Sequence, residues 1–123
     1  MTPRIRLAAA AFAALLAAPA RAAPDAHAQR ESDHLLAFVA SSACRFVRGG
    51  VEHDAREARD HLARKLDVAR PLIGSADAFV DHVASGSSLT GEPYRVRCGD
   101  RESTAKAWLA GELARYRRGA RSQ

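Results

Sequence analysis

Two cysteines, Cys44 and Cys98, are the residues of this chain whose chemistry is easiest to assign. Neither belongs to a Cys-x-x-Cys pair, and no histidine lies within two positions of either, which argues against a redox motif and a metal site. In an oxidising compartment the two thiols are expected to form a disulfide that closes a loop of roughly 55 residues. A redox or free thiol and metal ligation are the alternatives.

The histidines form no catalytic or metal-binding motif. One pair is spaced i, i+8 and none i, i+4, so a shared metal would depend on tertiary contacts. His53 and Asp54 could act as a general base with its orienting carboxylate, but adjacent side chains at a strand-to-helix junction diverge, and Asp54 is better explained as a helix cap. His-Glu-x-x-His and Gly-x-Ser-x-Gly signatures are absent from the sequence. We therefore expect no catalytic residue, no metal and no cofactor.

Arginines and hydroxyl groups are the candidate binding groups. Arg45, Arg95 and Arg97 alternate with other residues in two predicted strands, so they should stand on one face of a sheet. Three guanidiniums there would repel one another unless they are solvated, paired with acids or facing an anion. A hydroxyl-rich loop, Ser85 to Pro93, adds further candidates or only satisfies its own backbone in tight turns. Its candidate contact residues are Ser87, Ser88 and Thr90.

The N-terminal residues have the pattern of a secretory leader. Two arginines and no acid precede 14 uncharged residues, Leu7 to Ala20, and small residues follow at the spacing that a signal peptidase reads. At about 1.5 Å per residue this stretch is shorter than the roughly 30 Å hydrocarbon core of a bilayer, so we expect a cleaved leader rather than an anchor. Cleavage after Ala22 would leave a signal peptide, residues 1–22, and one domain, residues 23–123.

Length, composition and charge limit the class of protein. The chain has 123 residues, of which 47% are hydrophobic and 27% charged, which excludes a multidomain enzyme, a polytopic membrane protein and a coiled-coil rod. Loss of residues 1–22 would remove three arginines and no acid, lowering the formal charge from +5 to +2. A chain that is exported and has nearly equal numbers of basic and acidic residues is not expected to bind nucleic acid. It is also not expected to keep a stable membrane span.

Periodicity and turn residues predict the elements that position these groups. Apolar residues at helical spacing in residues 35–40 predict a first helix that begins between Asp25 and Ser32. The pair Gly49-Gly50, set between two short runs of strand type, predicts a tight β-hairpin.

Three further helices are indicated by caps and a proline. Asp54 and Glu57 form a capping box for the second helix, which should end at Arg70 because the next residue is proline. Ser75 is the expected cap of a short third helix, and Ser103 is the expected cap of the last one.

The cysteines connect these elements into a fold. Residues Tyr94 to Cys98 alternate and predict a strand, and a bond to Cys44 would hold this strand near the hairpin. We therefore predict the α+β class, with about four helices packed on a small antiparallel sheet made of the hairpin and one further strand, closed by one disulfide.

As an ordered set, these motifs resemble a family of small exported bacterial proteins, domain of unknown function 5329. The resemblance covers about Ser32 to Arg117, and the Gly49-Gly50 turn is a departure because relatives often have Asn-Gly there, which suits the same turn. It implies a leader, this size and a cysteine pair, and it carries over no catalytic residue. The segments that carry the resemblance are His34 to Val39, Cys44 to Gly50, the alanine-rich helix ending near Lys65, Ser87 to Tyr94 and Trp108 to Tyr116.

The expected role follows from export and from the missing catalytic motifs. We expect a periplasmic or secreted protein that acts as a non-catalytic accessory or binding module of the cell envelope, with an anionic envelope component or another envelope protein as its partner. The alternative is a small envelope hydrolase that uses a histidine or a hydroxyl near the Ser85 to Thr90 loop. A third hypothesis is self-association through an exposed apolar strip.

Overall fold

The structure is a computed structural model that describes residues 2–4, 8–11, 13–14 and 25–122. The predicted cleavage after Ala22 lies outside the described residues. None of the described helices is both long enough and apolar enough to cross a bilayer.

Helices account for most of the described chain after residue 25. Three of the helical segments, which lie between the second long helix and the last one, are only three to five residues long, and Pro71 and the non-helical residues 73–75 interrupt the chain there. The helical segments are α1 (Ala26–Ser41), α2 (Ala55–Ala69), a 3₁₀ turn η1 (Arg70–Leu72), α3 (Ala76–Ala78), a π-helical turn η2 (Phe79–Val83) and α4 (Ala105–Arg121).

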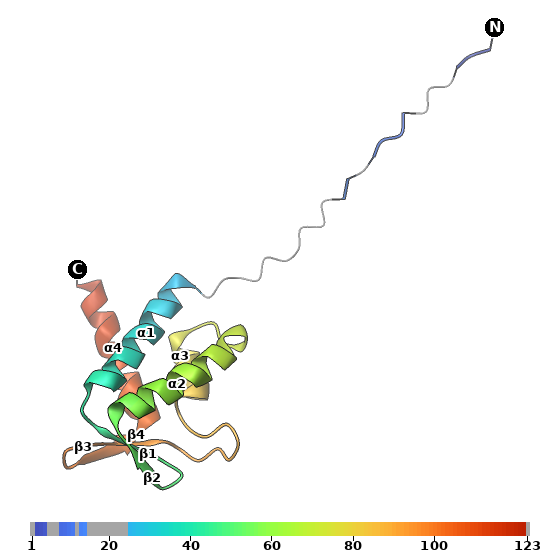
Figure 1. Cartoon of the computed structure of the whole chain (residues 1–123). Coiled ribbons are helices and arrows are strands. Elements are labelled where there is room, and N and C mark those ends of the chain that lie inside the picture. The colour runs from blue at the N-terminus through green and yellow to red at the C-terminus, as the bar shows by residue number, and fades with distance from the viewer. Residues whose placement is uncertain (1, 5–7, 12, 15–24, 123) are drawn as a thin grey trace.

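One antiparallel sheet of four strands lies beneath the helices, in the order β2-β1-β3-β4. Figure 1 shows the helices gathered on one side of this sheet. Its central strands are far apart in the sequence, and they place the hairpin next to the strand that ends in Cys98. The strands are β1 (Arg45–Arg48), β2 (Val51–His53), β3 (Arg95–Cys98) and β4 (Arg101–Thr104).

Local signals place the first half of the fold correctly. Gly49 and Gly50 both have positive φ, 55° and 77°, the conformation that a tight hairpin turn requires. The Asp54 carboxylate accepts a hydrogen bond from the Glu57 N–H at 2.8 Å and caps α2. The Glu57 carboxylate does not complete the capping box and instead accepts from His53 Nδ1 at 3.0 Å.

The strand β4 is an addition to the predicted sheet. Gly99, with φ of 64°, and Asp100 form a turn that brings the chain back along β3. The expectation that Ser103 caps the last helix is wrong, because Ser103 lies in β4 opposite Val96. Thr104 is the cap, and its hydroxyl accepts from the Ala107 N–H at 3.2 Å. The polar run of β4 has no apolar alternation, so its pairing with β3 is not visible in the sequence.

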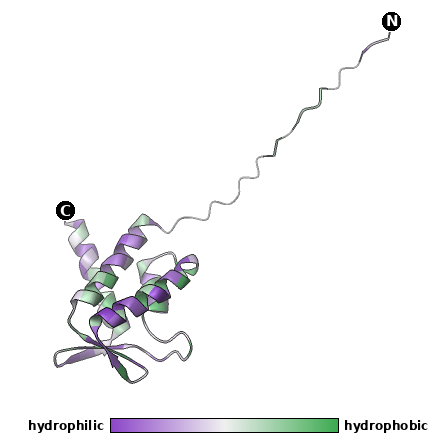
Figure 2. Cartoon of the chain, viewed as in Figure 1, coloured by the Kyte–Doolittle hydropathy of each residue, from purple (hydrophilic) through white to green (hydrophobic). Residues whose placement is uncertain are grey.

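The core lies between the inner face of the sheet and the helices. Phe46 and Val96 project from the sheet against buried helix residues such as Leu35, Leu66 and Leu109. In Figure 2 the hydrophobic colouring follows the inward sides of the helices. The predicted α+β class is confirmed.

The predicted disulfide is also confirmed. Cys44 and Cys98 are bonded with an S–S distance of 2.04 Å. The bond joins the residue before β1 to the last residue of β3, so it closes the sheet at the point where the two halves of the chain meet. A structural disulfide of this kind indicates an oxidising compartment.

Candidate functional site

The outer face of the sheet carries the arginines singled out in the sequence. Arg45 and Arg97 are direct cross-strand partners on β1 and β3, and Arg95 lies two residues before Arg97. Side chains two residues apart on a strand share a face, so all three guanidiniums project away from the helices. Their neighbours Phe46 and Val96 are buried, whereas the three arginines are exposed.

Acids on the neighbouring strands pair with these arginines. Arg97 Nη2 donates to Glu52 Oε1 at 2.6 Å, and Arg45 Nε lies 3.7 Å from the same oxygen. Arg95 Nε donates to Glu102 Oε1 at 2.7 Å, and this hydrogen bond lowers the pKa of the Glu102 carboxyl. Three arginines therefore share two carboxylates, and Arg45 is the least well satisfied of the three.

The charges on this outer face are ordered across the sheet. Glu52 stands on the edge strand β2 and Glu102 on the edge strand β4. The arginines stand on the two central strands. The face therefore has a positive centre between two negative edges, and we call it the Arg–Glu face (Arg45, Glu52, Arg95, Arg97 and Glu102).

The hydroxyls of the loop between η2 and β3 are engaged by the loop itself. Ser87 Oγ accepts hydrogen bonds from the N–H groups of Leu89 and Thr90, both at 3.2 Å. Thr90 Oγ1 accepts from the Glu92 N–H at 3.2 Å, and Ser88 is exposed. Across the described chain, no hydrogen bond joins these hydroxyls to the arginines, so the two groups of candidate residues form no single site.

The alternative hypothesis, a hydrolase that uses a histidine or a hydroxyl near the Ser85 to Thr90 loop, directs attention to a shallow groove beside this loop. It has a volume of about 260 Å³ and is lined in part by His82, Ser85 and Ser87. Ser85 Oγ donates to the Asp81 carbonyl oxygen at 2.9 Å. Among the described residues, no hydrogen bond joins His82 to either serine, so this geometry does not activate a hydroxyl as a nucleophile.

A polar network that sequence reasoning missed lies between α2, β1 and the start of β3. Lys65 Nζ donates to Tyr94 Oη at 3.0 Å and to the Gly86 carbonyl oxygen at 2.7 Å. Arg48 Nη1 lies 3.4 Å from His61 Nε2, and Tyr94 Oη lies 3.2 Å from the same nitrogen. Because arginine only donates, His61 Nε2 is the acceptor and the Tyr94 hydroxyl donates to it. A buried tyrosine needs such partners, and the alternation of residues Tyr94 to Cys98 was the one signal in the sequence for the network.

The environment of His61 keeps it neutral. Burial of its ring, with the positive charges of Arg48 and Lys65 nearby, lowers the pKa of His61 to about 4. Above pH 6.5 the side chain is neutral in both the folded and unfolded states. Below that pH the unfolded chain binds a proton that the folded chain excludes, so stability must fall toward pH 4.

We expect His61→Gln to remove part of the acid sensitivity of folding. Between pH 7 and pH 4.5 the wild type should lose about 2 kcal/mol more stability than the variant, a value reduced for the partial exposure of the ring. Urea unfolding at the two pH values measures the difference. His82→Gln is the matched control, since His82 is exposed, and it should keep the pH dependence of the wild type. Equal pH dependence in wild type and His61→Gln would contradict the assignment.

Another side-chain cluster holds α1, α3 and α4 together. Arg117 donates from Nε and Nη2 to the two oxygens of Glu31 at 2.6 and 2.8 Å. It also donates from Nη1 and Nη2 to the two oxygens of Asp77 at 3.1 and 2.7 Å. Glu31 is only 2% exposed, and the hydrogen bond with Arg117 keeps the pKa of its carboxyl below the ordinary value despite burial. Sequence reasoning missed this cluster, because the partners are 86 and 40 residues apart.

A second set of contacts ties α1 to α4 further along α1 and earlier on α4. His34 Nε2 donates to Glu112 at 2.8 Å, and the His34 ring stacks on Tyr116 with 4.0 Å between the ring centroids. Arg115 also donates to Glu112. Burial raises the pKa of Glu112, but the hydrogen bonds from Arg115 and His34 outweigh it, and the net shift is downward.

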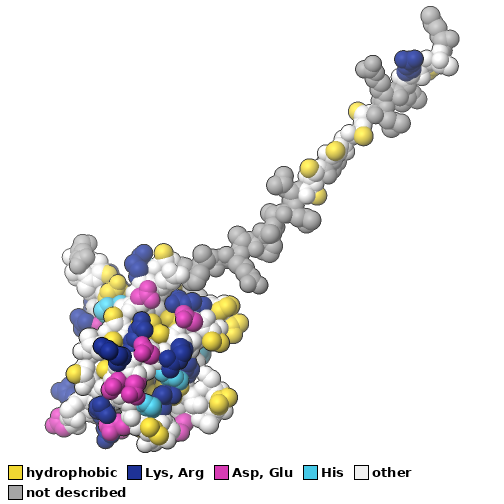
Figure 3. Space-filling model, in the orientation of Figure 1, with side chains coloured by type: hydrophobic (Ala, Val, Ile, Leu, Met, Phe, Trp, Pro, Cys, Tyr) yellow, Lys and Arg dark blue, Asp and Glu magenta, His cyan; other side chains and the backbone are white. Residues whose placement is uncertain are grey.

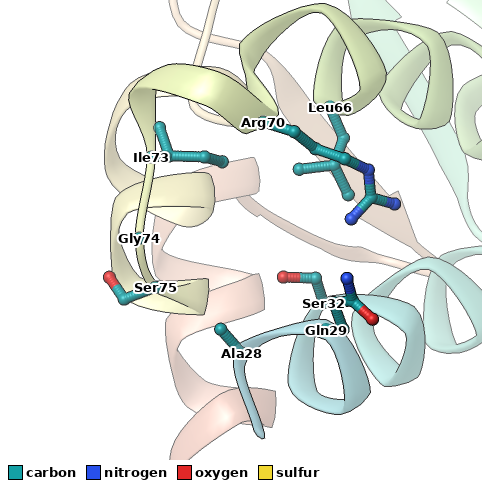
Figure 4. Close-up of a pocket in the computed structure, with 8 residues that line it drawn as sticks. All are labelled: Ala28, Gln29, Ser32, Leu66, Arg70, Ile73, Gly74 and Ser75. Atoms are coloured by element: carbon teal, nitrogen blue, oxygen red, sulfur yellow. The ribbon is translucent and has the colours of Figure 1, made fainter. Parts of the chain in front are cut away.

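Metal-binding groups are not assembled in the described part of the chain, where no three His, Cys, Asp or Glu side chains come together. A further pocket between α1 and the end of α2 is about 20 Å³, room for about one water molecule. Figure 4 shows the Ser32 hydroxyl pointing into the gap between α1 and the Gly74-Ser75 turn, with Arg70 above it. This pocket is too small to hold an organic ligand.

Exposed apolar side chains bear on the hypothesis of self-association. Val68 and Leu72 are 81% and 88% exposed, and hydrophobic side chains gather at the end of α2 in Figure 3. Val51 and Leu89 are exposed on β2 and on the loop before β3. Self-association through an exposed apolar strip stays a prediction.

These features define a class of protein: a small α+β domain, closed by one disulfide, that leaves a charged sheet face uncovered. The chain belongs to the family of unknown function DUF5329, whose match spans residues 26–117 and so includes both cysteines, the Arg–Glu face and Arg117. It is also similar to the uncharacterized protein YfeK of Salmonella typhimurium (strain LT2), with 42% identity over 86 residues that cover 69% of this chain and 72% of the relative. No solved structure was found to match the chain. The resemblance drawn from the sequence is confirmed.

Proposed function

We propose that this protein is exported, loses residues 1–22, and acts in the periplasm or outside the cell as a non-catalytic accessory protein that binds another envelope protein. The leader pattern and the Cys44–Cys98 disulfide support export. The uncovered Arg–Glu face supports binding, and it is the observation that carries the proposal.

The order of charge on the Arg–Glu face decides which kind of partner it fits. A polyanion such as a membrane surface or an acidic polysaccharide would meet Glu52 and Glu102 at both edges and be repelled there. A protein surface can place acids opposite the arginines and bases opposite the glutamates. Arginine is also enriched at protein interfaces, where its planar fork binds carboxylates bidentately. The partner is therefore a protein with an acidic centre and basic flanks.

The helical side of the molecule is less suited to such an interface. Figure 3 views the molecule over α1 and α2 and shows basic and acidic side chains interspersed, with no block of one sign. Charges mixed in this way suit solubility more than recognition of one complementary patch. The Arg–Glu face differs because its charges are sorted by strand.

The loop hydroxyls support a non-catalytic role. Ser87 and Thr90 accept hydrogen bonds from backbone N–H groups of their own loop, and Ser85 donates to the Asp81 carbonyl oxygen. These bonds shape the loop that leads into β3. Hydrolysis of envelope lipid or peptidoglycan by the purified protein, lost on Ser87→Ala or His82→Ala, would contradict this part of the proposal.

Site-specific photocrosslinking in intact cells tests the binding face. A photoreactive residue at Val47, which lies on the Arg–Glu face between Glu52 and Arg95, should capture one defined protein. The double variant Arg95→Glu/Arg97→Glu should reduce the yield at least about tenfold, because it places like charges opposite the acids of the partner. Added salt should also weaken capture.

Matched controls separate the face from general charge effects. Arg56→Glu/Arg64→Glu makes the same change of charge on exposed positions of α2 and should leave capture at Val47 unchanged. A photoreactive residue at Arg56 should not capture the same protein. Equal loss with both double variants, or capture of lipid or polysaccharide in place of a protein, would overturn the proposal.

A further inference from the structure

A groove between α1 and α4 is larger than the groove beside the loop and the small pocket of Figure 4. The two helices run side by side in opposite directions, as the pairs Glu31 with Arg117 and His34 with Glu112 require (Figure 1). Near the first turns of α1 and the last turns of α4 they enclose a groove of about 470 Å³. This volume is in the range of small-molecule sites and far exceeds the single-water pocket of Figure 4.

The carboxylate at the floor of the groove is paired with an arginine. Glu31 lines the groove, but both of its oxygens accept hydrogen bonds from Arg117. Arg117 is held in turn by Asp77 on α3. The Glu31 carboxylate therefore does not repel an anion as a free carboxylate would.

The rim of the groove carries two further arginines on opposite walls. Arg30 comes from α1 and Arg121 from α4, and both side chains are exposed. Within residues 25–122 neither makes an ion pair. Three arginines (Arg30, Arg117 and Arg121) line the groove, and only two carboxylates, those of Glu31 and Asp77, pair with them, so the arginines outnumber the acids.

Tyr116 adds a neutral donor on the same wall as Arg121. Its ring is held by stacking on His34, and its hydroxyl makes no hydrogen bond to a described residue. Ala120, one helical turn after Tyr116, is a small apolar residue that also lines the groove. The groove thus combines charged donors, a phenol hydroxyl and a short apolar surface made by the Tyr116 ring and Ala120, which suits a small organic anion.

We propose that this groove binds the phosphate group of a small phosphate ester or of a lipid headgroup, clamped between Arg30 and Arg121. A phosphate presents oxygens in several directions and can accept from two guanidiniums on opposite walls. A carboxylate has its two oxygens in one plane and is satisfied by one arginine fork. The organic part of the ligand lies along Tyr116 and Ala120. This site is separate from the Arg–Glu face and does not depend on it.

Titration of the disulfide-bonded protein with glycerol phosphate tests the site. Calorimetry at low salt should detect binding, and Arg30→Gln/Arg121→Gln should weaken it at least about tenfold. Arg118→Gln is the matched control: Arg118 lies on the same helix outside the groove, and its loss should leave the affinity unchanged. Arg95→Glu/Arg97→Glu should also leave it unchanged, which keeps this test independent of the proposed protein partner.

Vesicles distinguish the source of the phosphate. Sedimentation with phosphatidylglycerol vesicles, lost in Arg30→Gln/Arg121→Gln and absent with phosphatidylcholine vesicles, identifies a lipid headgroup. Binding of glycerol phosphate without vesicle binding identifies a soluble ester. An equal loss of affinity in Arg118→Gln shows that only diffuse charge is at work and overturns the proposal. No binding of either probe at about 10 mM phosphate overturns it as well.

Discussion

Removal of the Cys44–Cys98 disulfide is expected to lower the free energy of unfolding by about 4 kcal/mol. The bond spans a sequence separation of 54 residues, and opening it releases the loop-closure constraint on the unfolded chain. Both ends lie at the sheet: Cys44 is buried before β1 and Cys98 ends β3. Urea unfolding of Cys44→Ala/Cys98→Ala against the wild type measures the effect.

This loss is a large part of the stability that a domain of this size has. Small domains are stable by about 5–15 kcal/mol, so the variant should be marginal at 37 °C. Reductant added to the wild type should reproduce the loss, and it should have no effect on the double variant, which is the control. A wild type whose unfolding midpoint is unmoved by full reduction would contradict the prediction.

Replacement of Arg117 by methionine should have the next largest effect, about 3 kcal/mol of destabilisation. The substitution keeps most of the side-chain volume but leaves Glu31, which is 2% exposed, buried without its partner. It also frees Asp77, so α3 loses its hydrogen bonds to α4. Thermal or urea unfolding of Arg117→Met at pH 7 measures the change.

Two further variants show that the effect belongs to the buried pair. Arg118→Met removes a neighbouring exposed arginine and should change stability by no more than about 0.5 kcal/mol. Adding Glu31→Gln to Arg117→Met should recover part of the loss, because the unpaired charge is gone. A double variant less stable than the sum of the two single changes would contradict this account.

The pH dependence of the same pair has a defined sign. The pKa of Glu31 is lowered in the folded state, so the stability that the pair contributes is present above the ordinary glutamate pKa and is lost as pH falls through the lowered value. In Arg117→Met this acid loss should be absent or reversed. It adds to the His61 effect, which sets in at higher pH.

Much of the fold is predictable from short-range chemistry. The Gly49-Gly50 turn, the Asp54 and Ser75 caps and the end of α2 before proline each depend on residues within a few positions, whereas the start of α1 was placed only between Asp25 and Ser32. The pairing of the cysteines is also predictable, because the chain has only two. Alternation alone is enough to place Arg95 and Arg97 on the side of β3 opposite Val96.

The errors occur where the local signal is weak or points to the wrong residue. Ser103 and Thr104 are adjacent and both suit a helix cap, and only the pairing of β4 with β3 decides between them. The strand β4 has polar residues throughout, so nothing in its pattern separates it from a loop. The Gly99-Asp100 turn after Cys98 was the signal that could have indicated a second hairpin.

Local chemistry was enough to predict four helices, the Gly49-Gly50 turn, the disulfide and the direction in which the strand arginines point, because each follows from the geometry of a few neighbouring residues or from having two cysteines. The contacts that these side chains make with distant residues could not be predicted from local geometry. Glu52 and Arg97 are 45 residues apart, and Glu31 and Arg117 are 86 apart. Such pairs depend on how the helices and strands pack, so the buried glutamate, the neutral His61 and the groove between α1 and α4 are properties of the folded chain.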